Sequence, residues 1–180
     1  MAEATGLSES DVEYELIAFA VAGRVTHSAG DFGGWGLTEA GRAAVAEWIA
    51  DELEKVGTRT DVARAYDGFL ALNPELLNLC TAWQTRSADG VMTLNDHTDP
   101  VYDARVLDRL TDFDTRAQVI CADLAATMLR FQRYGLRLAD ALARAKSGQV
   151  DYVAVSTVSY HTVWFQLHED LLTTLGIPRF

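Results

Sequence analysis

The stretch Ser159–Asp170, with the sequence SYHTVWFQLHED, predicts one amphipathic helix together with the residues that follow it. On a wheel of 3.6 residues per turn, the apolar residues share one broad face: Tyr160, Val163, Trp164, Leu167, Leu171, Leu172 and Leu175. His161 and His168 fall on the same side, about two turns apart. A buried imidazole needs a partner or must stay neutral. This face therefore either closes on a core that satisfies both histidines or lines a pocket that uses them.

The remaining pattern predicts a mainly α-helical protein, with residues 58–180 forming a multi-helix array of six or so helices. Apolar residues recur every three or four positions over Val101–Tyr134, and Gly135 is expected to bend or end that helix. Asn73-Pro74 is expected to separate two further helices, because proline disfavours helical backbone at the preceding residue. Residues 87–100 are expected to form a loop, in which Asp99 caps the long helix and Pro100 takes its first position.

The first part, residues 1–57, predicts a helix, a hairpin and a second helix. Ser8 is a suitable N-cap with Asp11 three residues on, and the buried stripe of this helix is expected at Val12, Leu16, Phe19 and Ala20. A Gly-rich turn at residues 29–34 then separates two short strands. Thr38 is expected to cap the helix that follows the hairpin and ends at Gly57.

Two segments of this first part, TGLSESDVEYEL (5–16) and GWGLTEAGRAA (34–44), resemble a winged helix-turn-helix of the MarR/PadR-like kind. Three later segments resemble a helical domain that follows such winged helices in actinobacterial regulators: FLALNPELLNLCTAWQ (69–84), LNDHTDPVYDARVLDRL (94–110) and SYHTVWFQLHEDLL (159–172). The resemblance implies a truncated winged helix with a β-hairpin wing, a role in regulating transcription, and a homodimer paired through helices outside the wing.

The charge pattern argues against direct DNA binding. The chain carries a net charge of −11, which opposes long-range attraction to phosphates. The helix in the recognition position carries Glu9, Asp11, Glu13 and Glu15, whereas a helix that reads the major groove needs Arg, Lys, Asn or Gln. DNA is therefore a doubtful partner for this chain.

Composition bounds the remaining possibilities. With 180 residues and 49% hydrophobic content, the chain is long enough to bury a sizeable core. No apolar stretch approaches the ~20 residues that a membrane-spanning helix needs, and residues 1–10 lack the features of a signal peptide. We therefore expect a cytoplasmic protein without a membrane partner, in which Cys80 and Cys121 are reduced core residues.

The candidate site is drawn from aromatic, amide and imidazole side chains. The expected ligand-binding residues are Trp83, Gln84, His97, Tyr160, His161, Trp164, Phe165 and His168. Such a set suits a small, largely apolar ligand. A metal site built with Asp96, Asp99 or Glu169 is the weaker alternative, because His161 and His168 are seven residues apart. We expect no metal and no cofactor.

The sequence is compatible with three functions. The first is a winged-helix-derived regulator that binds a small ligand in its helical domain. The second is an enzyme that uses His161 or His168 as general acid or base, with Asp96 or Glu169 orienting the imidazole. The third is a protein-protein interaction module, in which the histidines are satisfied inside the core.

Overall fold

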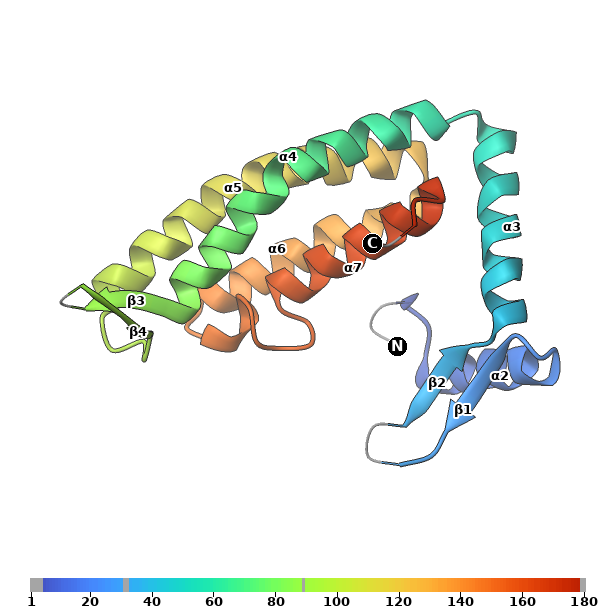
Figure 1. The fold of residues 1–180 in the computed structure, drawn as a ribbon, viewed down its shortest axis with the longest axis horizontal. Helices are drawn as coiled ribbons and strands as arrows, with labels where there is room; N and C mark the ends of the chain where they lie inside the picture. The colour runs from blue at the N-terminus through green and yellow to red at the C-terminus, as the bar shows by residue number, and fades with distance from the viewer. Residues whose placement is uncertain (1–4, 31–32, 89, 179–180) are drawn as a thin grey trace. The chain divides into compact units, whose positions relative to one another are not determined.

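The computed structural model describes residues 5–30, 33–88 and 90–178, and within them the chain is mainly helical. These residues form six α-helices and two small antiparallel strand pairs (Figure 1). The chain divides into two compact units: unit 1 is Met1–Gly57 and unit 2 is Thr58–Phe180. None of the helices in these ranges combines the length and apolar character needed to cross a bilayer.

Unit 1 consists of α2 (Glu9–Val21), β1 (Val25–Ser28), β2 (Gly34–Leu37) and α3 (Glu39–Val56). The strands are antiparallel, with Val25 opposite Leu37 and Ser28 opposite Gly34. The predicted cap of α2 is confirmed, because the backbone N–H of Asp11 donates to Ser8 Oγ at 3.2 Å. The predicted hairpin and the helix after it are confirmed as well.

The junction between β2 and α3 explains the TEAGR segment (38–42) physically. Thr38 Oγ1 accepts from the Gly41 N–H at 3.0 Å and donates to the Gly23 carbonyl at 2.7 Å. A Cβ atom at Gly41 would lie 1.9 Å from the Arg24 carbonyl oxygen, so only glycine fits there. These contacts fasten the end of α2, the hairpin and the start of α3 to one another.

The predicted stripe of α2 is less covered than expected. Val12, Leu16, Phe19 and Ala20 are half-buried, and no residue of α2 is fully buried. The Phe19 ring lies 6.3 Å from the ring of Trp48 on α3. The four residues were expected to be buried but are only half-buried, because the two-stranded hairpin and α3 are too few to enclose α2 within unit 1.

Unit 2 is a bundle of four long helices with a hairpin at one end (Figure 1). Helix α4 packs on α5 and α7, and α6 packs on the same two helices. The elements are α4 (Arg59–Gln84), β3 (Thr85–Ala88), β4 (Val91–Leu94), α5 (Pro100–Thr127), η1 (Leu129–Phe131), α6 (Gln132–Lys146), η2 (Val150–Tyr152) and α7 (Tyr160–Leu175). Unit 2 therefore has fewer and longer α-helices than the six or so expected.

Helix α4 accounts for part of this difference, because it runs without a break through Pro74. The predicted break at Asn73-Pro74 is wrong. A proline inside a helix costs about 3 kcal/mol. Burial of Phe69 and Leu76 on either side of it offsets that cost. Asn73 also serves the bundle directly, since its Oδ1 accepts from Trp164 Nε1 at 3.0 Å.

The break between α5 and α6 lies at Met128, whose extended backbone has φ −144° and ψ 116°. The prediction that Gly135 bends or ends the long helix is therefore wrong. Gly135 lies within the first turn of α6, where a Cβ atom would lie 2.9 Å from Gln118 Oε1 and 3.3 Å from Cys121 Cβ. Its role is to let α6 approach α5 closely.

The prediction that residues 87–100 form a loop is wrong in part, because the first half of this range belongs to a β-hairpin that was not predicted. Strands β3 and β4 pair antiparallel, with Thr85 opposite Leu94 and Arg86 opposite Thr93. Gly90 adopts φ +79° at the turn. Asp89-Gly90 is a favoured hairpin dipeptide, and Asp89 itself lies outside the described residues.

Helix α7 and the predicted Asp99 cap of α5 are confirmed. Ser159 caps α7, and Gly176 ends it with φ 68°. Asp99 Oδ1 accepts from the first free amides of α5, with Pro100 at the first position. Six of the seven residues on the predicted apolar face of α7 are buried: Tyr160, Val163, Trp164, Leu167, Leu171 and Leu175. The two cysteines of unit 2 are free and buried.

Candidate functional site: the His97 surface

The end of α4 is closed by groups from the loop and helix that follow the hairpin. The last carbonyls of a helix have no partner within it. Here the Tyr102 hydroxyl contacts the Ala82 carbonyl at 2.7 Å. Asn95 supplies two donors, its Nδ2 to the Trp83 carbonyl at 3.0 Å and its backbone N–H to the Gln84 carbonyl at 2.8 Å. Asn95 is buried, and it fixes the loop against α4.

Asn95 also determines how His97 is oriented. Its second Nδ2 hydrogen is directed to Asp103 Oδ1 at 2.8 Å, so both hydrogens of the amide are used. His97 Nδ1 lies 2.9 Å from Asp103 Oδ2 and 3.2 Å from Asn95 Nδ2. Because both amide hydrogens of Asn95 have shorter contacts, we assign the proton to Nδ1, which then donates to the Asp103 carboxylate. In the neutral imidazole, Nε2 is left as the acceptor.

The backbone of His97 is held in an unusual conformation. His97 has φ +58° and is the only residue other than glycine with positive φ among those the structure describes. The left-handed region costs roughly 1–2 kcal/mol for most residues. Such residues cluster at functional sites, where the surroundings hold them in place. The imidazole lies over the Trp83 ring, with centroids 4.6 Å apart, and 23% of the side chain is exposed.

Asp96 faces a different set of groups. Thr98 Oγ1 donates to Asp96 Oδ1 at 2.8 Å, and Arg86 Nη2 approaches the same oxygen at 3.1 Å. The hydrogen bonds from Thr98, assisted by the charge of Arg86, hold the pKa of Asp96 below its usual value. Asp96 is thus an ionised turn residue paired with Arg86, and the carboxylate that orients His97 belongs to Asp103.

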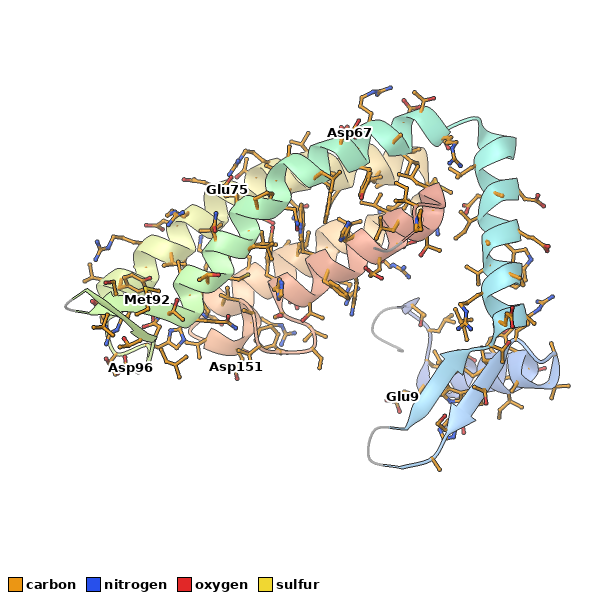
Figure 2. All side chains as sticks on the ribbon, viewed as in Figure 1. Glu9, Asp67, Glu75, Met92, Asp96 and Asp151 are labelled. Atoms are coloured by element: carbon orange, nitrogen blue, oxygen red, sulfur yellow. The ribbon has the colours of Figure 1, made fainter. Side chains whose placement is uncertain are left out.

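Exposed apolar side chains lie around this loop. Val91 and Met92 are 63% and 62% exposed, Leu94 is 81% exposed, and Val101 is 65% exposed. Met92 and Asp96 lie at the same end of unit 2 (Figure 2). Because side chains alternate along a strand, Met92 and Leu94 share one face of β4 and Val91 lies on the other. We call these four residues together with His97 the His97 surface.

The other predicted site residues lie apart from this surface. Tyr160 and Trp164 are core residues, and the Tyr160 hydroxyl donates to Asp114 Oδ1 at 2.8 Å. Burial raises the pKa of Tyr160 well above its ordinary value, with the Asp114 charge adding to it. Gln84 is exposed at the end of α4, and Phe165 is 46% exposed on α7.

His161 and His168 are both half-buried on α7. The His168 ring stacks on Phe69 at a centroid distance of 5.0 Å, farther back along α4. Phe69 lies about 22 Å along the helix from Gln84, the last residue of α4, at 1.5 Å per residue, and Arg86, the partner of Asp96, follows in β3. The predicted pairing of Asp96 with His168 is therefore not formed. His161 donates its backbone N–H to the Val153 carbonyl at 3.0 Å.

Two pockets among the described residues have linings that do not include His97, His161 or His168. An open groove of about 310 Å³ lies between α4 and α5, lined by Asp61, Arg64, Ala65, Gly68, Ile120, Asp123, Ala126 and Thr127. A smaller one of about 70 Å³ lies within unit 1, lined by Phe19, Arg24, Val25, Leu37, Gly41, Val45 and Trp48. Neither lining contains a predicted ligand-binding residue.

Within the described ranges, no group of three or more His, Cys, Asp or Glu side chains is placed to hold a metal ion.

Two residues that determine the site, Asn95 and Asp103, were not among the predicted contacts. The sequence did indicate the position of Asp103, because it follows the cap residue Asp99 by one helical turn and so lies on the same side of α5.

No protein-family model, curated protein or solved structure matches this chain.

Proposed function

We propose that this chain is a regulatory protein of the winged-helix-derived kind, whose unit 2 binds a small, largely apolar ligand at the His97 surface. The observation that carries the proposal is a histidine oriented by a carboxylate, in a loop that follows an exposed apolar strand and precedes the exposed Val101. Apolar surface supplies non-directional affinity, and a few placed polar groups supply orientation. The regulatory role rests on the resemblance of unit 1 to a winged helix.

The order of elements in unit 1 supports that resemblance. A helix, a hairpin and a long helix follow one another, and Thr38 and Gly41 fasten their junction. The negative charge of unit 1 favours regulation without direct DNA contact. Residues 1–57 contain 11 acidic side chains against three basic ones, and such a surface repels phosphates. Regulation would then pass through another protein.

The orientation of His97 specifies the polar part of the ligand. Because Nδ1 donates to Asp103, Nε2 accepts a hydrogen bond when the imidazole is neutral. A matching ligand is therefore apolar and carries one O–H or N–H donor. Benzyl alcohol is a suitable probe, and benzyl methyl ether is its matched control because it has the same ring without the donor.

Calorimetric titration of the full chain tests this proposal. Benzyl alcohol is expected to bind more tightly than the ether, and His97→Asn is expected to remove the difference. Asparagine tolerates the left-handed backbone of this position, so the variant retains the loop. His161→Asn is the control and should behave as the parent protein. Equal binding of both probes to the parent protein, or a preference that survives in His97→Asn, contradicts the proposal.

The paired imidazole and carboxylate favour a second candidate, an enzyme with His97 as general base. A neutral Nε2 can take a proton from a water molecule as that water attacks a carbonyl carbon. The enzyme alternative thus moves from His161 and His168 to His97. The probe is p-nitrophenyl acetate at neutral pH. Hydrolysis above background that is lost in His97→Asn supports this candidate, and rates equal to background in the parent protein remove it.

A further inference from the structure

Helix α2 has a second apolar face, opposite the half-buried one. Tyr14, Ile17 and Val21 are 72%, 51% and 86% exposed. Their spacing of three and four residues places them in a line along one side of the helix. The half-buried Leu16 and Phe19 point the other way, toward the rest of unit 1. We call Tyr14, Ile17 and Val21 the α2 stripe.

Acidic residues lie on both sides of this stripe. At 100° per residue, Asp11 and Glu15 fall on one flank and Glu13 on the other, and all three are exposed. Helix α2 contains no lysine or arginine. Arg24, the first basic residue after it, has its guanidinium over the Trp48 ring at 4.8 Å. The stripe is therefore an apolar line between two negative edges, with no cation of α2 to neutralise them.

We propose that the α2 stripe docks a basic amphipathic helix of another protein. Anchors at i, i+3 and i+7 are the pattern by which two helices pack along each other. Negative edges select a partner whose apolar face is bordered by Lys or Arg, because like charges at a helix pair are unfavourable and opposite charges fix register. This inference concerns unit 1 and stands independently of the ligand proposed for unit 2.

The same charges argue against other occupants. A second copy of α2 brings four further carboxylates, from Glu9, Asp11, Glu13 and Glu15, and no basic residue to meet them. Duplex DNA presents phosphates, which these carboxylates repel. A basic helix alone satisfies both the apolar line and its borders.

Fluorescence anisotropy with the full chain tests the docking. The probe is a labelled helical peptide of leucine and lysine, with its leucines on one face. The matched peptide has glutamate in place of lysine. Only the lysine peptide is expected to bind, and its affinity should fall as salt is added.

The decisive variant is Ile17→Glu. It adds a negative charge, so attraction by charge alone would become stronger, whereas docking on the stripe should weaken by about tenfold or more. Leu136→Glu is the matched control, because Leu136 is 68% exposed on α6 in unit 2, and it should bind as the parent does. Circular dichroism of both variants checks that the helices are retained.

Three results overturn the proposal. One is the absence of binding by the lysine peptide to the parent chain, as expected if the stripe is covered by another part of the same chain. Another is unchanged or tighter binding by Ile17→Glu. The third is sedimentation in which the parent chain self-associates and Ile17→Glu does not, because a second copy would then be the occupant.

Discussion

Asn95 is the residue whose loss should be felt most at the His97 surface. In Asn95→Ala, the Trp83 carbonyl and Asp103 Oδ1 each lose their donor, and the His97 N–H loses its acceptor. A buried polar group left without a partner costs about 1–3 kcal/mol. The Trp83 carbonyl, at the closed end of α4, should pay the larger part, while Asp103 is 13% exposed and can recover some hydration. The expected loss of unfolding free energy is about 2–4 kcal/mol.

Urea denaturation followed by far-ultraviolet circular dichroism measures this loss, with Asn78→Ala as the matched control. Asn78 is exposed on α4, so its truncation should change the unfolding free energy by no more than ~0.5 kcal/mol. Asn95→Asp should also be destabilising at neutral pH, because it places a carboxylate against Asp103 and the Trp83 carbonyl. A loss in Asn95→Ala no larger than in Asn78→Ala refutes the idea that Asn95 closes α4.

Four further outcomes are expected. Burial raises the pKa of Cys80 and of Cys121 to about 12. Ellman's reagent at pH 8 should therefore modify both thiols only after denaturation. Rapid labelling of the native protein would contradict their burial. Burial also raises the pKa of Tyr134 to about 12. A raised pKa stabilises the fold below the unfolded value near 10, so this contribution to stability should be lost as the pH rises toward 12. Absorbance at 295 nm should detect the ionisation, and Tyr134→Phe should diminish it. Mobility-shift assays at physiological salt should find no sequence-specific duplex binding by the chain, against which submicromolar binding with a steep salt dependence would count. Light scattering should return twice the 19.7 kDa chain mass, and a monomer mass at tens of micromolar would remove the homodimer.

Features that depend on neighbouring residues were predictable from the sequence. Ser8, Asp99 and Ser159 each cap a helix through a side-chain oxygen, and capping needs only the residues of the first turn. The apolar face of α7 follows from the spacing of its own residues. The hairpin of unit 1 follows from its Gly-rich turn.

Features that depend on distant packing were not predictable in the same way. Proline is a strong local signal, but at Pro74 the packing of α4 on α5 and α7 overrides it. Gly135 is required by its approach to Gln118, seventeen residues earlier in the chain. The same holds at the site, where His97 was one of the predicted ligand-binding residues. The orientation of its ring depends on Asn95, whose amide is shared between the end of α4 and the start of α5.

The most direct test of the ligand-binding proposal uses the methionine methyl groups. Met92 is 62% exposed on the His97 surface, and Met128 is 3% exposed between α5 and η1. In a protein labelled with 13C at these methyls, titration with benzyl alcohol should shift the Met92 signal in a saturable way and leave the Met128 signal in place. The Met92 shift should be lost or strongly reduced in His97→Asn. A Met92 signal that does not move, or that moves equally in His97→Asn, would contradict the assignment of ligand binding to this surface.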